Sequence, residues 1–179
     1  MSGPQPWVTL REDVIADYEI FRVRRRRAVS PRTGVEHNFH LVDVPRWVIV
    51  IPSLPDGQLL MVEQYRHAAE AVSLEFPAGI MEPDEDPIAA AKRELREETG
   101  YAADRFELLP VIRPDPAINT NTLAVVLAHD CVEAGAPEQD EAEDVHVLQM
   151  HASEVDCAII DGRIFHAMVI AAWWLREHA

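Results

Sequence analysis

The chain has 179 residues, which fits one domain with at most a small appended subdomain. Apolar residues make up 48% of it, enough to bury a core, so the composition argues against a disordered protein. The formal net charge of −15 disfavours a nucleic-acid backbone or an anionic membrane as the main partner. An anionic substrate would therefore need a bridging cation or a local basic patch.

The cysteines and the apolar runs indicate where the protein works. Cys131 and Cys157 form no Cys-x-x-Cys pair, so a disulfide framework is not expected. Two reduced cysteines are expected, and a single bridge between them is the alternative. The first residues, MSGPQPWVTLREDV, are short of apolar character, and no apolar run is long enough to span a bilayer. We expect a cytoplasmic protein that does not bind membranes.

The first 45 residues contain two strand-like segments, 18–29 and 37–44, separated by the turn sequence SPRTG. We therefore expect an N-terminal antiparallel β subdomain over residues 1–45 and a second domain over residues 46–179. Residues 24–27 of the first strand are all arginine. They could attract an anionic substrate, pair with acids of a partner subunit, or be exposed strand side chains that do neither.

Residues 47–66 are expected to form a β-hairpin. RWVIVIPS is a continuous apolar run suited to a buried strand, LPDGQ is a turn, and LLMVEQYR is the second strand. A short strand in VSLEFPAG would follow and end at Pro77. Further strands are expected in FELLPVI, TLAVVLAHD and VHVLQM, and the acidic segment EAGAPEQDEAED precedes the last of these as a loop.

A helix is expected over residues 87–99. Asp86 suits the N-cap, Pro87 the first helical position, and Gly100 the left-handed position just past the end.

A second helix is expected over residues 164–177, and a short one over residues 153–160. The long one is apolar nearly all round, so it should be substantially buried, and its Trp173 and Trp174 would pack or form a dimer contact. These elements together predict an α+β fold, with a mixed β-sheet sandwiched between helices.

Three glutamates of the first helix, Glu94, Glu97 and Glu98, share one face because they are spaced i, i+3, i+4. Their repulsion costs only a few tenths of a kcal/mol per pair, so a solvated acidic face is one explanation. A metal site is the other, since acids crowd the preceding loop and the irregular segment EFPAG can present a bare carbonyl. Such oxygens are the ligands of Mg²⁺ or Mn²⁺. The pattern predicts metal-assisted chemistry on a phosphate.

Residues 79–101 resemble the Nudix box, G-x5-E-x7-R-E-U-x-E-E-x-G-U. Only the last position departs, because Tyr101 stands where a bulky aliphatic residue is usual. The segment VEQYRHAAEAVSLEFPAGIME and the C-terminal helix also resemble the nucleoside-diphosphate-sugar branch of that family, over roughly residues 46–175. The matching box residues are Gly79, Glu85, Arg93, Glu94, Leu95, Glu97, Glu98 and Gly100.

The resemblance implies a Nudix fold and a hydrolase in which water attacks a phosphorus of a nucleoside diphosphate linked to another group. It implies Mg²⁺, with Mn²⁺ as a substitute. Arg93 would pair with a box glutamate and orient it. Glu85 would either anchor its loop or contact the metal through water. The implied metal ligands are Glu94, Glu97, Glu98 and the backbone carbonyl of Ala78.

The resemblance also implies site residues outside the box. The general base would come from the acidic loop, with Glu141 as first choice and Glu143 as second, unless that loop is only solvated. Arg66 and Glu75 match positions that touch substrate phosphate or metal-bound water in relatives. A surface ion pair is the alternative for Arg66.

Two further residues bear on the substrate. Pro116 lies fifteen residues after Tyr101, where a proline marks ADP-ribose pyrophosphatases, although it could serve turn geometry alone. Trp47 could stack a nucleobase or pack in the core. The segment DPAINTN resembles broad nucleotide-sugar hydrolases, including GDP-mannose enzymes.

The leading hypothesis is a metal-dependent hydrolase that cleaves ADP-ribose or a related nucleoside diphosphate sugar to a nucleoside monophosphate and a sugar phosphate. Alternatives are a GDP-mannose or broad nucleotide-sugar hydrolase, a non-catalytic nucleotide-sensing domain, and an enzyme for damaged nucleoside triphosphates or RNA ends. Because relatives exchange N-terminal strands to complete the substrate pocket, a homodimer is expected.

Overall fold

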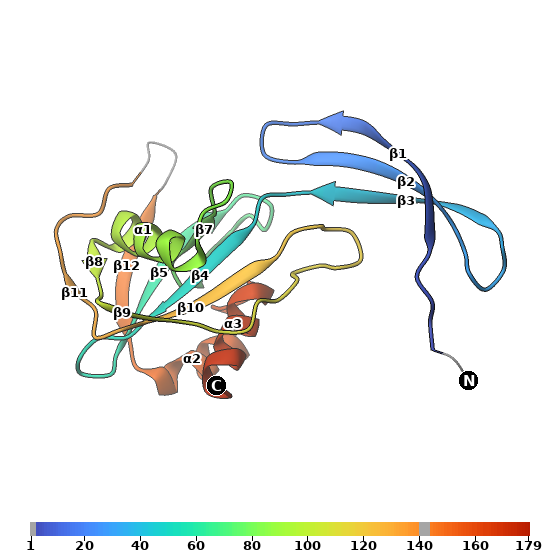
Figure 1. Cartoon of the computed structure of the whole chain (residues 1–179). Coiled ribbons are helices and arrows are strands. Elements are labelled where there is room, and N and C mark those ends of the chain that lie inside the picture. Colours follow the sequence, from blue (N-terminus) through green and yellow to red (C-terminus); the bar gives the residue numbers. More distant parts are fainter. Residues whose placement is uncertain (1–2, 140–143) are drawn as a thin grey trace. The chain divides into compact units, whose positions relative to one another are not determined.

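The computed structural model describes residues 3–139 and 144–179, which form two compact units (Figure 1). The first unit contains the residues up to 45 together with residues 113–121. The second contains residues 46–112 and 122–179. Sequence patterns did not indicate that a segment from the middle of the chain would join the N-terminal unit. The assignment of a dimerisation role to the N-terminal residues stays a prediction.

The first unit is built on a three-stranded antiparallel sheet in the order β1-β2-β3. The strands are β1 Val8–Asp17, β2 Arg22–Val29 and β3 Glu36–Asp43. The expected strand–turn–strand unit is confirmed as β2 and β3. Sequence analysis missed β1, because Arg11, Glu12 and Asp13 interrupt its apolar alternation.

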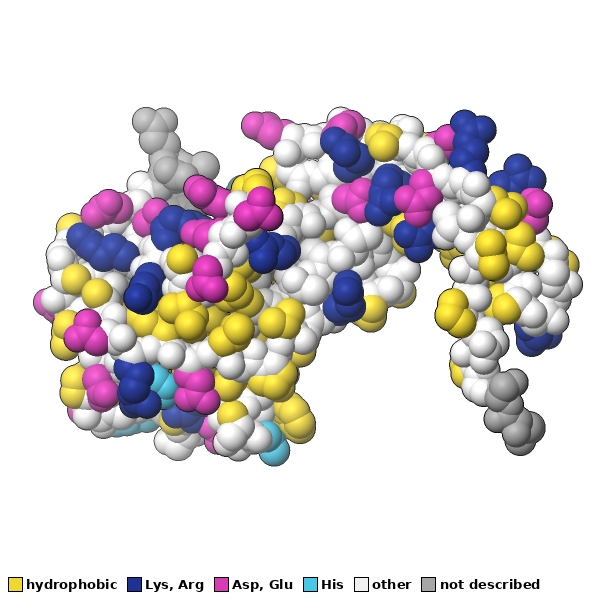
Figure 2. Space-filling view, viewed as in Figure 1, with side chains coloured by type: hydrophobic (Ala, Val, Ile, Leu, Met, Phe, Trp, Pro, Cys, Tyr) yellow, Lys and Arg dark blue, Asp and Glu magenta, His cyan; other side chains and the backbone are white. Residues whose placement is uncertain are grey.

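The four consecutive arginines of β2 pair with acids of the same sheet. Arg24 contacts Asp43 of β3 and Glu12 of β1, and its hydrogen bond lowers the pKa of Asp43 below the usual value. Arg25 pairs with Asp13, Arg26 with Glu12, and Arg27 with Glu36. Figure 2 shows basic and acidic side chains interspersed on the visible face of this unit. The geometry favours the alternative in which the arginines neither attract a substrate nor pair with a partner subunit, because acids of their own sheet contact them.

The segment 113–121 lies beside the end of β3 and is hydrogen-bonded to it. The backbone N–H of Val42 donates to the carbonyl of Ile118 at 2.9 Å, and the Thr120 N–H donates to the Val42 carbonyl at 3.1 Å. The Asn121 side chain donates to the Pro45 carbonyl at 3.0 Å. These bonds tie the DPAINTN segment to the first unit.

The second unit contains three sheets. One has the order β7-β4-β10-β9, in which only the β4–β10 pair is parallel; another has the order β12-β5-β6 and is antiparallel; the third pairs β8 with β11. The strands are β4 Trp47–Pro52, β5 Leu59–Arg66, β6 Ala71–Glu75, β7 Ala78–Ile80, β8 Tyr101–Ala102, β9 Arg105–Leu108, β10 Leu123–His129, β11 Val132–Glu133 and β12 Val145–Met150.

The expected hairpin over residues 47–66 is wrong. Strands β4 and β5 are joined by a tight turn, but beyond an isolated bridge between Ser53 and Leu59 they pair with other strands in different sheets. Both strands carry continuous buried runs, since residues 48–52 and 59–62 are all buried. A strand that is apolar on both faces carries no local signal for its hydrogen-bonding partner.

Helices cover both faces of the strand layer in the second unit (Figure 1). On β4, Val48 and Val50 pack in the cluster that contains α1, whereas Ile49 and Ile51 pack in the cluster that contains α2 and α3. The helices are α1 Pro87–Thr99, α2 Ala152–Ile160 and α3 Ala167–Glu177. The predicted α+β architecture, a mixed sheet sandwiched between helices, is confirmed.

Helix α1 has the predicted bounds and caps. The Asp86 carboxylate accepts from the backbone N–H groups of Ile88 at 2.9 Å and Ala89 at 3.2 Å. At the other end, Gly100 adopts φ +75°, in the left-handed region that favours glycine. Local capping chemistry was therefore sufficient to place this helix.

Helix α3 differs from its prediction in two respects. It begins at Ala167, because Ile164 is still engaged with α2 through its N–H to the Ala158 carbonyl. Burial is also one-sided: Trp173 is buried and bonds to Asp156, whereas Trp174 is 58% exposed. The near-uniform apolar character of the helix did not predict this asymmetry.

Both cysteines are free, as expected, with Cys131 buried and Cys157 exposed. None of the helices in residues 3–139 and 144–179 combines the length and the apolar character needed to cross a membrane.

Candidate active site

The acidic face of α1 borders a cavity of about 390 Å³, here called the acidic cavity. Two of its glutamates are buried, with Glu94 6% and Glu98 4% exposed, whereas Glu97 is partly exposed. A solvated acidic face does not account for two buried carboxylates, because side chains of a solvated face are exposed to water. Ala78 of β7 also lines the cavity, so all four predicted metal ligands border the same space.

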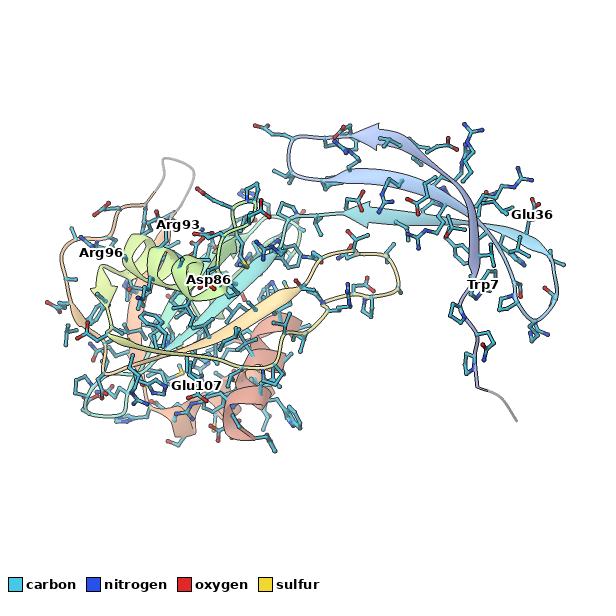
Figure 3. All side chains as sticks on the ribbon, viewed as in Figure 1. Trp7, Glu36, Asp86, Arg93, Arg96 and Glu107 are labelled. Carbon is cyan, nitrogen blue, oxygen red and sulfur yellow. The ribbon has the colours of Figure 1, made fainter. Side chains whose placement is uncertain are left out.

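Arg93, which projects from α1 (Figure 3), contacts two of these carboxylates. Its Nη1 donates to Glu94 Oε1 at 2.7 Å and to Glu97 Oε2 at 3.1 Å. Its Nη2 donates to the Ile80 carbonyl at 2.9 Å, which ties α1 to the end of β7. The surrounding carboxylates raise the pKa of Arg93, led by its hydrogen bond to Glu85, so the guanidinium stays charged. This geometry suits the positioning role expected for Arg93.

Glu85 holds the loop before α1 in place. Its carboxylate accepts two hydrogen bonds from Arg93, both at 3.2 Å, and one from the backbone N–H of Glu82 at 2.9 Å. The hydrogen bond from Arg93 lowers the pKa of Glu85. Arg46, which sequence analysis did not single out, adds a bond to the Glu85 carbonyl at 3.0 Å. The observed contacts are those of the loop-anchoring alternative.

Gly79 leaves room for the Glu94 carboxylate. A Cβ atom built at Gly79 would lie 2.1 Å from Glu94 Oε1, and its φ is not in the positive range. The glycine is therefore required by space rather than by backbone conformation.

The donor set fits a hard divalent cation. Glu85, Glu94 and Glu97 place three carboxylates around the guanidinium of Arg93, and Glu98 lines the acidic cavity beside Glu94 and Glu97. Among the described residues, no three His, Cys, Asp or Glu side chains have already converged into a metal-binding group. Glu94 and Glu97 contact Arg93, and Glu98 Oε2 accepts from the Ala78 N–H at 3.2 Å. Convergence of these carboxylates on a cation would require modest rotations of their side chains.

A second cavity of about 320 Å³, here called the apolar cavity, shares Arg66 and residues 78–80 with the acidic cavity. Trp47 is partly buried, packs against the core and also lines the apolar cavity, so both of its predicted roles are compatible with its position. Most of the remaining wall is apolar. Its lining residues include Val48, Ile49, Ile80, Leu123 and Met168.

Arg66 and Glu75 form a two-pronged ion pair where the cavities adjoin. Arg66 Nε donates to Glu75 Oε1 at 2.8 Å, and Nη2 donates to Oε2 at 2.6 Å. Glu75 is only 1% exposed, and its hydrogen bonds raise the pKa of Arg66. The pair is thus more than the surface ion pair considered as the alternative, and it fixes the plane of the guanidinium.

His166 also lines the apolar cavity and was missed by sequence analysis. The signal that could have singled it out is its place immediately before the apolar C-terminal helix. Because that helix was expected to begin at residue 164, His166 was assigned to its interior.

The comparisons with known proteins agree with this geometry. Residues 44–172 match the model of the family described as NUDIX domain. The chain belongs to the NUDIX family. It is 44% identical over 170 residues to ADP-sugar pyrophosphatase of Mus musculus, covering 86% of this chain and 78% of the relative. It is 34% identical over 147 residues to ADP-ribose pyrophosphatase of Bacillus subtilis strain 168, covering 79% of this chain and 80% of that relative.

A crystal structure described as an ADP compounds hydrolase shares the fold, with a TM-score of 0.88 at 22% identity over 99% of this chain and 96% of that chain. The predicted Nudix fold and the assignment to the Nudix hydrolases are confirmed. Hydrolases of this family use divalent metal ions, in accord with the oxygen donors of the acidic cavity.

The acidic loop of this Nudix protein is anchored at the end of α1. The Glu138 N–H donates to the Glu97 carbonyl at 2.8 Å, and Arg96 donates to the Ala136 carbonyl at 2.8 Å. Arg96 also pairs with the Glu138 carboxylate at 3.1 Å, and Glu138 lines the acidic cavity. Sequence analysis singled out neither Arg96 nor Glu138. The two predicted bases, Glu141 and Glu143, lie outside the described residues.

Pro116 belongs to the segment 113–121 of the first unit. Its predicted contribution to substrate binding stays a prediction.

Substitution Gly79→Ala should lower hydrolytic turnover by about 10- to 100-fold, because the methyl group would displace the Glu94 carboxylate. It should also raise the concentration of divalent metal at which turnover is half-maximal. Turnover measured across a titration of the divalent metal checks this. Gly57→Ala is the control, since Gly57 has φ +86° but open space around it, and should cost stability rather than turnover. Wild-type metal dependence in Gly79→Ala would contradict the importance of the Glu94 position.

Proposed function

We propose that the protein is a Mg²⁺-dependent pyrophosphohydrolase of ADP-ribose or a closely related nucleoside diphosphate sugar. From ADP-ribose it would release AMP and ribose 5-phosphate. The observation that carries the proposal is the pair of adjoining cavities, one acidic and one mostly apolar, with the guanidinium of Arg66 at their junction. Relatives named ADP-sugar pyrophosphatase and ADP-ribose pyrophosphatase support the substrate class.

The acidic cavity would hold the cation through Glu94, Glu97, Glu98 and the carbonyl of Ala78. A bound divalent cation lowers the pKa of a coordinated water and offsets charge developing on the phosphoryl oxygens. Mn²⁺ has similar ligand preferences and would substitute for Mg²⁺. Arg93 contributes by holding Glu94 and Glu97 on the cavity side of α1.

Arg66 would bind the diphosphate. Its Nε and Nη2 face Glu75, which leaves the N–H groups of Nη1 for a phosphate oxygen. Glu75 holds the guanidinium plane before substrate arrives, so less side-chain freedom is lost on binding. With a net charge of −15, the chain needs such local cations to accept an anionic substrate.

The general base would be Glu141, with Glu143 as the second choice, supplied by the acidic loop. Support comes from the described flank of this loop, where Glu138 is tied to α1 and borders the acidic cavity. The protein would act in the cytoplasm, as its two free cysteines suggest.

We further propose a homodimer formed through the first unit. Its sheet exposes several large apolar side chains, which contact with a second copy would remove from water. The most exposed ones on β1 are Val8, Leu10, Val14 and Ile15.

One set of kinetic measurements tests both the substrate and the proposed metal-binding face of α1. It ranks kcat/KM for ADP-ribose, ADP-glucose, GDP-mannose and NADH with Mg²⁺, and it compares the wild-type protein with a variant of a proposed metal ligand. ADP-ribose should rank first, and Glu98→Gln should lower its turnover by about 100- to 1,000-fold without unfolding the protein. Glu107→Gln, an exposed glutamate of β9, is the matched control and should change little. A top rank for GDP-mannose would favour the alternative substrate, and near-wild-type turnover of Glu98→Gln would refute the metal-face assignment.

The identity of the base is tested by three glutamine variants of one loop. Glu141→Gln should lower kcat by about 100- to 10,000-fold with little change in substrate binding. Glu138→Gln and Glu143→Gln should be much milder. A large loss confined to Glu143→Gln or to Glu138→Gln would move the base to that residue.

The oligomeric state is tested by light scattering at micromolar concentration. The expected mass is twice the 20.2 kDa of one chain. A mass of one chain at that concentration would refute the homodimer.

A further inference from the structure

The lining of the apolar cavity includes three residues with titratable side chains, Arg66, Glu75 and His166. Arg66 and Glu75 satisfy one another through two hydrogen bonds of 2.8 Å and 2.6 Å. His166 differs, because the one hydrogen bond that its side chain makes to a described residue uses only Nδ1. A ligand in this cavity would therefore meet an imidazole ring whose Nε2 is not used by this hydrogen bond.

Helix α3 fixes the ring of His166. His166 is the N-cap of this helix, and its Nδ1 accepts from the backbone N–H of Met168 at 3.2 Å. The N–H groups of Val169 and Ile170 donate to the His166 carbonyl at 3.0 Å and 3.2 Å, so its backbone is held as well. Because both the backbone and the ring of His166 are held by hydrogen bonds, its side chain loses little conformational freedom when a ligand binds.

The same hydrogen bond fixes the tautomer. Because Nδ1 accepts from Met168, the single proton of the neutral ring must lie on Nε2, which is then a donor. Burial lowers the pKa of His166, and the Arg66 charge acts in the same direction while Glu75 opposes them, so the surroundings favour the neutral ring.

The position of the apolar cavity limits what part of a substrate can reach it. It joins the acidic cavity at Arg66 and residues 78–80, where the proposed function places the diphosphate. In any nucleoside diphosphate sugar, the group attached to each phosphate is a sugar. Whichever end of the diphosphate enters the apolar cavity, the first group beyond it therefore carries hydroxyl oxygens.

We propose that His166 is a specificity-determining residue whose Nε2–H donates a hydrogen bond to a sugar oxygen of the substrate in the apolar cavity. The inference rests on the proposed function for its substrate class. The apolar wall formed by Trp47 and Met168 would cover the sugar ring, while Arg66 holds the adjoining phosphate. This assigns the recognition of the sugar to the start of α3, outside the Nudix box.

The test is His166→Asn, because Asn is a strong N-cap residue that can still accept from the Met168 N–H but is too short to replace Nε2–H. KM for ADP-ribose should rise about 3- to 10-fold with kcat nearly unchanged, as for loss of one hydrogen bond made equally in the ground and transition states. The dissociation constant of ADP-ribose, measured by calorimetry without catalysis in Glu98→Gln and in Glu98→Gln with His166→Asn, should rise by the same factor.

The matched control is His151→Asn. His151 is the N-cap of α2, is exposed and does not line the apolar cavity, so this variant should leave KM unchanged. Comparing ADP-ribose with ADP-glucose tells which sugar is contacted. An equal effect on both assigns the contact to the adenosine ribose, and unequal effects assign it to the terminal sugar.

An unchanged KM and dissociation constant in a folded His166→Asn protein would overturn the proposal. So would a fall in kcat alone. If wild-type protein binds ADP-ribose without hydrolysing it, only the proposed function fails, and calorimetry with the wild-type and His166→Asn proteins still decides the role of His166. If wild-type protein neither binds nor hydrolyses any nucleotide sugar, both proposals fall.

Discussion

The guanidinium of Arg93 is the contact on which the site depends. It lies among Glu85, Glu94 and Glu97 and also bonds to the Ile80 carbonyl, so it joins the box loop, α1 and the end of β7. Charges this close to one another and partly removed from water would repel strongly without a cation between them. The single positive charge of Arg93 does not balance the three carboxylates that it contacts. The remaining negative charge is what makes the acidic cavity suitable for a divalent ion.

The chain creates two different cavities by changing sheets between β6 and β7. Strand β6 pairs with β5 and places Glu75 against Arg66, whereas β7 pairs with β4 and places Ala78 and Gly79 beside the carboxylates of α1. Pro77 lies at the break, and its carbonyl accepts from the Val50 N–H at 2.9 Å. Residues 78–80 of β7, together with Arg66, form the wall shared by the acidic and apolar cavities. A diphosphate lying across this wall would have the proposed metal ligands on one side and the apolar cavity on the other.

The two units are stabilised by different interactions. The second unit has apolar clusters on both faces of its strands, and complete burial of a residue such as Leu95 contributes roughly 1.5–3 kcal/mol. The first unit relies on antiparallel pairing and on arginine–carboxylate pairs across its strands. Such partly exposed pairs contribute about 1 kcal/mol or less each. The association with a second copy that we propose would instead rest on its exposed apolar side chains.

The sequence by itself determined the features that depend on a few neighbouring residues. Helix α1 and its caps, the shared face of its three glutamates and the membership of the NUDIX family all followed from residues 78–101. The architecture followed from the order of apolar patterns. Each of these signals is local: helical spacing places residues on one face, and caps act within one turn.

The tertiary structure alone decided which distant residues meet. The separation of β4 from β5, the acids that take up the arginine run and the pairing of Arg66 with Glu75 depend on burial and cross-strand register. The position of His166 depends on where α2 ends and α3 begins. Periodicity assigns a residue to a face but not to a partner, because many strands with similar apolar faces could satisfy the same pattern.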